Sequence, residues 1–123
     1  MNWQDWIEFA EENFLAALEN KEKRGLSAIL LAHQAAEKYL KAIWIKQEKL
    51  PERSHDLVLL LKTIEPNANH DLLQAARDLN YFLPRARYPN TPQKPGAESV
   101  EKVIQSTILL RTFARERLGL ENI

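Results

Sequence analysis

The stretch AHQAAEKYLKAIW, residues 32–44, indicates the fold class of this chain, because its apolar residues recur with helical spacing. Together with Ala28 and Ile29 they cover a sector of roughly 160° when successive residues are placed 100° apart. So broad an apolar face needs more than one partner, and the spacing therefore predicts a central helix over about residues 26–49. The opposite sector carries the polar side chains Gln34, Glu37, Lys38 and Lys41, with His33 at its margin.

The rest of the chain continues the helical pattern, with only three glycines in 123 residues. Apolar steps of three and four residues predict further helices over about 2–20, 55–65, 69–82 and 98–118. Asn2 and Ser54 are the expected N-caps of two of them, with Asp56 in the first turn after Ser54, and Gly119 is the expected C-terminal stop. The sequence thus predicts one all-α domain over residues 1–123.

Residues 83–97, LPRARYPNTPQKPGA, interrupt the helical pattern. Of the six prolines in the chain, this segment holds Pro84, Pro89, Pro92 and Pro95. Long irregular segments in compact domains are usually either functional or disordered. The prolines stiffen this one, and Leu83 and Tyr88 can anchor it, so we expect an ordered loop.

The same loop carries a positive charge on Arg85, Arg87 and Lys94, beside the aromatic ring of Tyr88. Arginine can bind a phosphate through two hydrogen bonds and tyrosine can stack on a base, as a nucleotide or single-stranded RNA contact requires. The alternative is an arginine that ties the loop to the bundle by bonding Glu37 or a backbone carbonyl. The sequence leaves both alternatives open.

The composition excludes several classes of function. Seventeen basic and seventeen acidic side chains cancel, so net charge provides no general attraction to nucleic acid or to an anionic membrane. The absence of cysteine excludes disulfides, thiolate metal ligands and thiol catalysis. The acidic N-terminal residues do not form a signal peptide, and no stretch is apolar enough for a membrane span. We therefore expect a cytoplasmic protein that does not associate with membranes.

Four motifs occur in a characteristic order: HQAAEKYLKA at residues 33–42, SHDL at 54–57, LNYF at 79–82 and RYPN at 87–90. In this order and spacing the chain resembles the HEPN family (higher eukaryotes and prokaryotes nucleotide-binding) over essentially its whole length. The family typically has a Gln-Ala-Ala-Glu-x-x-x-Lys helix, a His-Asp-Leu helix start and an Arg-Tyr-Pro-Asp loop. One departure is Asn90, which stands where the family has aspartate.

This resemblance implies an up-and-down bundle of four to five helices that commonly forms a homodimer. It also implies a small prokaryotic protein encoded beside, or fused to, a minimal nucleotidyltransferase, in pairs that can act as toxin and antitoxin. Other branches of the family are metal-independent ribonucleases, whose signature is an arginine followed by four to six residues and then histidine. The sequence does not contain this signature, because no arginine stands at the required distance before His33, His55 or His70.

Further candidates have simpler interpretations. His33 and Glu37 are one helical turn apart, but a stable zinc site needs about three protein ligands and no third is apparent. His55 is either a structural histidine at a helix start or a donor to a bound phosphate or base. Trp3, Trp6 and Trp44 are expected to be core or dimer-interface residues, and Arg111, Arg115 and Arg117 a solvated face.

These observations favour a non-catalytic nucleotide-binding protein that needs no cofactor or metal and partners a minimal nucleotidyltransferase. We expect Arg87, Tyr88 and His55 to make the first contacts, with Arg85 beside them and with Glu37 and Lys41 positioning them in a polar groove. Two alternatives are a ribonuclease toxin of a toxin–antitoxin pair and a purely structural dimerisation module.

Overall fold

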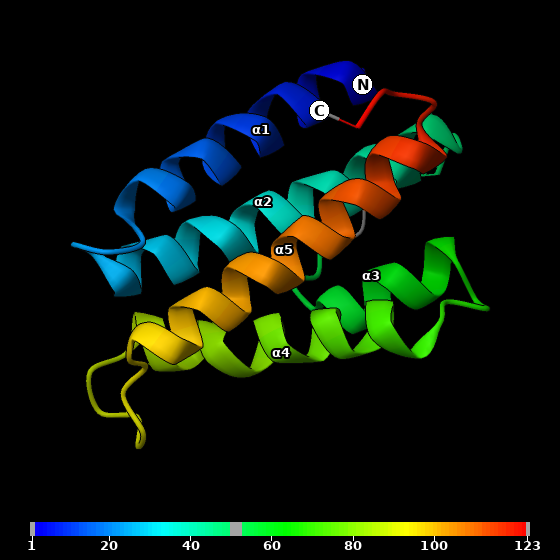
Figure 1. Cartoon of the computed structure of the whole chain (residues 1–123). Coiled ribbons are helices and arrows are strands. Elements are labelled where there is room, and N and C mark those ends of the chain that lie inside the picture. Colours follow the sequence, from blue (N-terminus) through cyan, green and yellow to red (C-terminus); the bar gives the residue numbers. More distant parts are fainter. Residues whose placement is uncertain (1, 50–52, 123) are drawn as a thin grey trace.

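The computed structural model describes residues 2–49 and 53–122, and the regular structure in them is entirely α-helical. Figure 1 shows the arrangement of the helices. In chain order they are α1 (Trp3–Asn20), α2 (Gly25–Lys46), α3 (Leu57–Ile64), α4 (His70–Arg87) and α5 (Ala97–Arg117). The predicted all-α bundle is confirmed.

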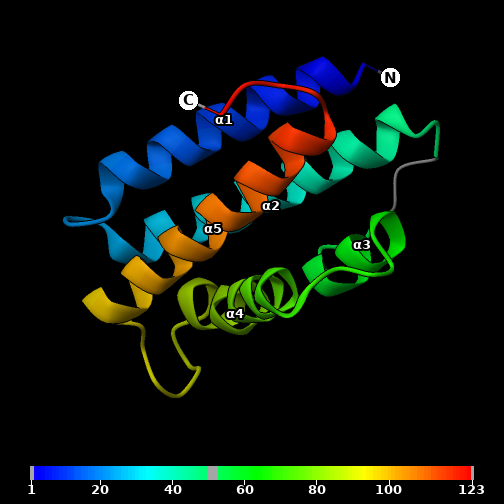
Figure 2. The same cartoon turned by 45° about the vertical axis from the view of Figure 1, so that its right-hand side comes forward.

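The α2 helix lies at the centre of the bundle, as its broad apolar face predicts. It contacts each of the other four helices. In Figures 1 and 2, α1 and α4 lie on opposite sides of α2 while α5 crosses it on a third side. Ala28, Ala32, Ala35, Ala36 and Ala42 are fully buried, so neighbouring helices can approach the α2 backbone closely.

Short polar side chains cap the starts of α1, α3 and α4, and one of these caps differs from the prediction. Asn2 caps α1 by accepting a hydrogen bond from the amide of Gln4, as predicted. The predicted N-cap Ser54 is wrong, because Asp56 occupies that position and accepts from the amides of Val58 and Leu59. Ser54 instead accepts from the amide of Asp56. The α3 helix therefore begins only at Leu57, and His55 lies before it.

The α4 helix is longer than predicted. It continues through Pro84 to Arg87, so the prediction of a loop from residue 83 was wrong for residues 83–87. Proline usually ends a helix because it lacks the amide proton that bonds the carbonyl four residues earlier. Here the last turn closes nevertheless, since the amide of Tyr88 donates to the carbonyl of Pro84 at 3.0 Å. The connection to α5 therefore begins at Tyr88.

The predicted solvated face is wrong for Arg111 and Arg115, whose side chains are largely buried, whereas Arg117 is exposed. Glu11 on α1 accepts hydrogen bonds from both Arg111 and Arg115 on α5, with the shortest distances at 3.1 Å. Arg117 pairs with Glu65 at 2.6 Å, beyond the end of α3. These arginines thus join α5 to other parts of the bundle, which a pattern of charges within one helix does not reveal.

Close contact between α2 and α5 depends on a glycine. A β-carbon at Gly25 would lie 2.9 Å from Cγ2 of Val100, closer than real β-carbons come to other atoms. The first turn of α2 therefore packs directly on the first turn of α5.

The three tryptophans gather at the other end of the α1–α2 pair. Trp3 and Trp6 stand at the start of α1, and Trp44 stands near the end of α2, which returns alongside it (Figure 1). Trp44 is buried and the other two pack partly buried against the core. Their expected role as core residues is consistent with this placement.

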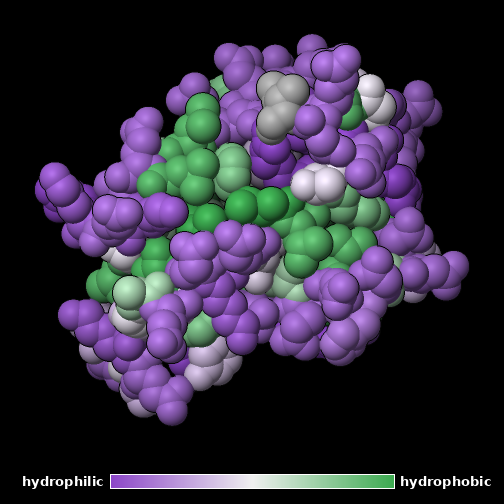
Figure 3. All heavy atoms as spheres, in the orientation of Figure 1, coloured by the Kyte–Doolittle hydropathy of each residue, from purple (hydrophilic) through white to green (hydrophobic). Residues whose placement is uncertain are grey.

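The molecular surface is not uniformly polar. Figure 3 shows a broad apolar band on the face along which α1 and α5 run, between hydrophilic regions. Leu15 on α1 and Leu109 on α5 are about half exposed. No helix in the described part of the chain is long and apolar enough to span a membrane.

Candidate functional site

Glu37 connects the polar residues of α2 with the segment before α3. Its Oε2 lies 2.8 Å from Nζ of Lys41, one turn further along α2. Its Oε1 lies 2.7 Å from Nδ1 of His55. Because a carboxylate only accepts, both the ammonium and the imidazole N–H donate to it. We call Glu37, Lys41 and His55 the Glu37 cluster.

Two members of the Glu37 cluster, Glu37 and Lys41, are largely shielded from solvent. Only 6% of Lys41 is exposed, and the side chain of Glu37 is 14% exposed. Burial alone would raise the pKa of the Glu37 carboxyl, but the hydrogen bonds from Lys41 and His55 outweigh burial and leave that pKa below its ordinary value. The carboxylate is therefore ionised at neutral pH and balances a buried ammonium, which would be costly to bury alone.

His55 is the accessible member of the cluster, because 69% of its side chain is exposed. One ring nitrogen is held by Glu37, which fixes the orientation of the ring. The other nitrogen is available to a ligand in solvent. The residue is thus anchored on one side, as a structural histidine would be, and open to solvent on the other.

His33 lies one turn before Glu37 and is 2% exposed. Burial lowers the pKa of His33 to about 4, against the negative charge of Glu37, which raises it. A hydrogen bond with Asn80 also raises this pKa, and the electrostatic effects of His55 and Arg87 lower it. His33 is therefore neutral at pH 7, and its Nε2 has no hydrogen-bond partner among the described residues.

Asn80 and Asp56 complete the surroundings of the cluster, and the sequence pattern did not predict either as a site residue. Asn80 on α4 accepts from the amide of Leu57 at 3.1 Å and donates to Oδ1 of Asp56 at 2.9 Å. It thereby fixes the start of α3, and with it His55, against α4. The available signal was the spacing of Asn80 and Arg87, which are seven residues apart and share one face of α4.

Arg87 ends α4 on the side that faces α2. Its charge lowers the pKa of His33, so the guanidinium lies within electrostatic range of that histidine, which stands one turn before Glu37. Arg87 is exposed and makes no ion pair within residues 2–49 and 53–122. Tyr88, the next residue, is 51% exposed. Both remain accessible to a ligand.

Arg85 is placed differently from Arg87. Helical geometry turns the two side chains about 200° apart. The guanidinium of Arg85 lies 3.6 Å from the ring centre of Tyr81, and its Nη1 donates to the Tyr81 carbonyl at 2.8 Å. Arg85 thus makes the structural contact with a carbonyl that the sequence left as the alternative role for an arginine of this segment.

A hollow of about 280 Å³ lies at the end of α4. We call it the α4 hollow, and its walls are Leu26, Arg85, Ala86, Arg87, Tyr88, Pro89, Thr91 and Lys94. It brings together Arg85, Arg87 and Tyr88, which were expected to contact a nucleotide. The other expected site residues, His55, Glu37 and Lys41, are not among its walls. For metal binding, within residues 2–49 and 53–122 no group of three or more acidic or histidine side chains is placed to hold an ion.

Comparison with known proteins identifies the family. The model of the HEPN domain matches residues 3–117. The chain belongs to the HEPN family. Among solved structures, the TT1696 protein of Thermus thermophilus is similar with a TM-score of 0.85 and 25% identity, over 95% of this chain and 99% of that one.

A second solved structure is also similar to this chain over nearly its whole length. ST0689, an archaeal HEPN homologue, is similar with a TM-score of 0.79 and 24% identity, over 96% of this chain and 98% of that one. No curated protein matches the sequence significantly. The HEPN fold is therefore shown over almost the whole chain.

Proposed function

We propose that this HEPN protein is a non-catalytic nucleotide-binding component that works with a minimal nucleotidyltransferase. One observation carries the proposal: Glu37 binds both a buried lysine and an exposed histidine, and the α4 end that carries Arg87 lies within electrostatic range of His33, one turn before Glu37. A structural ion pair alone does not require an accessible imidazole or an accessible arginine beside it.

Each residue has a separate task in this proposal. The guanidinium of Arg87 binds a phosphate through paired hydrogen bonds, and the ring of Tyr88 stacks on the base. His55 offers its free ring nitrogen to the ribose or the base. Glu37 orients that ring, and Lys41 keeps Glu37 ionised. Arg85 holds the turn in place through Tyr81.

Calorimetric titration of the purified protein with adenosine and guanosine nucleotides tests the binding step. We expect saturable binding that Arg87→Ala and Tyr88→Ala each weaken at least tenfold. Arg77→Ala is the matched control, because Arg77 is an exposed arginine on the same helix outside the α4 hollow. Equal binding by Arg87→Ala and Arg77→Ala, or no binding at all, would refute the nucleotide role.

The partners are part of the proposal. A homodimer would cover the apolar band over α1 and α5 (Figure 3), and Leu109→Lys is expected to reduce the dimer fraction in sedimentation experiments. Co-expression with a minimal nucleotidyltransferase is expected to give a complex that survives gel filtration. A monomer with no such complex would leave only the nucleotide-binding part of the proposal.

The ribonuclease alternative is favoured by one observation, which is that Arg87 and His55 both lie within electrostatic range of His33. RNA cleavage needs a base and an acid at the ribose 2′-hydroxyl, and His55 is the accessible candidate. Incubation of the protein with RNA distinguishes the two functions. Cleavage that Arg87→Ala and His55→Ala both abolish would replace our proposal, whereas intact RNA together with nucleotide binding supports it. A purely structural dimerisation module would show neither.

A further inference from the structure

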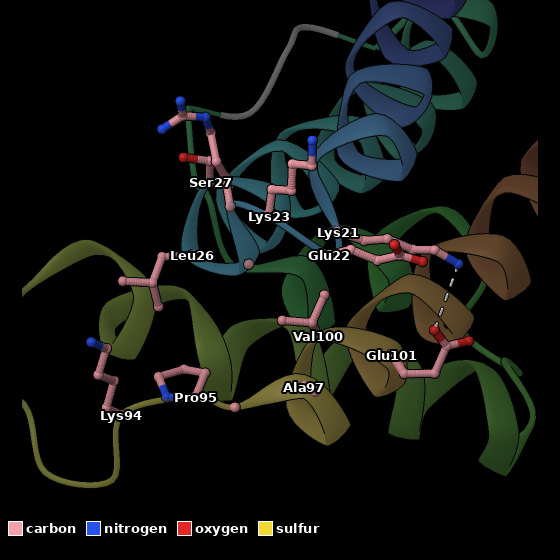
Figure 4. A pocket seen from close by; sticks show the side chains of 13 residues that line it. Lys21, Glu22, Lys23, Leu26, Ser27, Lys94, Pro95, Ala97, Val100 and Glu101 are labelled. Atoms are coloured by element: carbon pink, nitrogen blue, oxygen red, sulfur yellow. Dashed lines mark ion pairs between the residues drawn. The ribbon is translucent and has the colours of Figure 1, made fainter.

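A second and larger hollow, of about 720 Å³, lies where the starts of α2 and α5 meet (Figure 4). We call it the α2–α5 hollow. Its walls are Lys21, Glu22, Lys23, Arg24, Gly25, Leu26, Ser27, Lys94, Pro95, Gly96, Ala97, Val100 and Glu101. They come from the turn between α1 and α2, from the segment before α5 and from the first turns of both helices. None belongs to the Glu37 cluster.

The charged walls are predominantly cationic. Lys21 and Glu101 lie 4.0 Å apart and neutralise each other, as the dashed line in Figure 4 marks. Three further walls are cationic, exposed and without an ion pair within the described residues: Lys23, Arg24 and Lys94. The single other acidic wall is Glu22. A net positive charge therefore remains at the rim.

The base of the hollow is apolar. In Figure 4, the side chains of Leu26 and Val100 lie between Lys94 on one side and the Lys21–Glu101 pair on the other. Pro95 adds a further apolar wall. A free inorganic anion would leave this apolar surface uncovered, whereas an anion with an apolar body would cover it.

The backbone adds to the positive potential. The first helical bonds of α2 and α5 are made by the amides of Ala28 and Val100, so the amides of the preceding turns have no helical acceptor. Neither helix has a side-chain cap at its start. Two long helices thus direct their positive ends toward the same hollow whose rim already carries lysine and arginine.

We propose that the α2–α5 hollow binds a small phosphate monoester with an apolar or aromatic body. The phosphate binds the free amides and the cationic rim, which includes Arg24 and Lys94, and the body covers the half-buried Leu26 and Pro95 above the buried Val100. The inference does not rest on the proposed function, because Arg87, Tyr88 and the Glu37 cluster are not among the walls of this hollow. The two hollows share only Leu26 and Lys94.

The experiment titrates the full chain, in phosphate-free buffer, with phenyl phosphate, inorganic phosphate and phenol. We expect phenyl phosphate to bind at least tenfold more tightly than inorganic phosphate, and phenol not to bind. Arg24→Gln/Lys94→Gln is expected to weaken phenyl phosphate binding at least tenfold. Lys62→Gln, at an exposed lysine on α3, is the control and keeps wild-type affinity.

Two further outcomes keep this site separate from the proposed nucleotide site. Arg87→Ala is expected to bind phenyl phosphate like the wild type, even if it has lost nucleotide binding. The proposal is overturned if phenyl phosphate does not bind at millimolar concentration. It is equally overturned if Arg24→Gln/Lys94→Gln binds like Lys62→Gln, or if Arg87→Ala alone removes the binding.

Discussion

At the scale of single residues, Glu37 links the buried interior of the bundle to an accessible ring. One of its carboxylate oxygens binds the buried Lys41, and the other binds the exposed His55. The geometry explains how one carboxylate can both balance a buried charge and orient a surface imidazole. The binding properties of His55 should therefore depend on a residue that a ligand need not touch.

Replacing Glu37 tests the charge balance. Glu37→Gln leaves the ammonium of Lys41 buried without its counter-charge, and we expect a loss of about 2–3 kcal/mol in the free energy of unfolding. Glu12→Gln, at an exposed position on α1, should change it by less than about 0.5 kcal/mol. Urea denaturation measures both. Glu37→Gln/Lys41→Met should recover most of the loss, and no recovery would contradict the charge-balance explanation.

The buried His33 predicts a dependence of stability on pH. The unfolded chain protonates this histidine below about pH 6.5, whereas the folded protein does so only below about pH 4. Between these values the unfolded state binds more protons, so stability falls as the pH falls, by up to about 3 kcal/mol. The lowered pKa of Glu37 acts in the same direction at lower pH.

Urea denaturation at pH 7 and pH 5 measures this effect. His33→Gln is expected to flatten the pH dependence between pH 6.5 and 4, whatever its effect on stability at pH 7. His70→Gln, at the exposed start of α4, should retain the wild-type slope. An unchanged slope in His33→Gln would show that other groups cause the pH dependence.

At the scale of helices, the approach of α2 to α5 depends on Gly25. Alanine is a better helix former than glycine by about 1 kcal/mol, so an isolated helix would gain from Gly25→Ala. The added β-carbon would meet Val100, whose branched side chain has little rotamer freedom. We expect the clash to dominate and the melting temperature to fall.

Gly96 is the matched control for that change. A β-carbon there meets nothing within 4 Å, and its backbone does not require glycine. Gly96→Ala should therefore leave the melting temperature nearly unchanged, and Gly25→Ala/Val100→Ala should regain part of the loss. If Gly25→Ala stabilises the protein, the two helices can separate at no cost.

The sequence predicted helices well where local patterns decide them. The apolar spacing located α2, and Asn2 marked the start of α1. The prediction of the α3 N-cap was wrong because contacts between distant residues determine it. Asp56 has a hydrogen-bond partner on α4, and Ser54 does not. The prediction at Pro84 was also wrong, since tertiary packing sustains a helix that local preference would end. Asn80 was missed as a site residue for the same reason.

At the scale of the whole molecule, Glu11 joins the N-terminal helix α1 to the C-terminal helix α5. It is shared by Arg111 and Arg115 of α5, which lie a hundred residues away in sequence. Arg115 also donates to the carbonyl of Glu121 and so holds the C-terminal segment. The sequence pattern predicted a solvated face for Arg111 and Arg115. It could not reveal their ion pairs, because Glu11 stands near the opposite end of the chain.

Glu11→Gln is expected to destabilise the protein by about 2–3 kcal/mol, because two partly buried guanidinium groups lose one shared carboxylate. Glu8→Gln, on an exposed position of the same helix, is the control and should change stability by less than about 0.5 kcal/mol. Urea denaturation provides the comparison. Equal values for the two variants would mean that the ion pairs contribute nothing to the joining of α1 and α5.

The tryptophans have an optical consequence. Trp3, Trp6 and Trp44 all stand at the end of the α1–α2 pair that is remote from the turn at residues 21–24. Lysine side chains cover two of the indole rings, Lys46 at 5.0 Å from the ring centre of Trp3 and Lys49 at 5.7 Å from that of Trp44. Intrinsic fluorescence therefore follows the loosening of that end, and a ligand at the α2–α5 hollow leaves the emission unchanged unless the whole bundle responds.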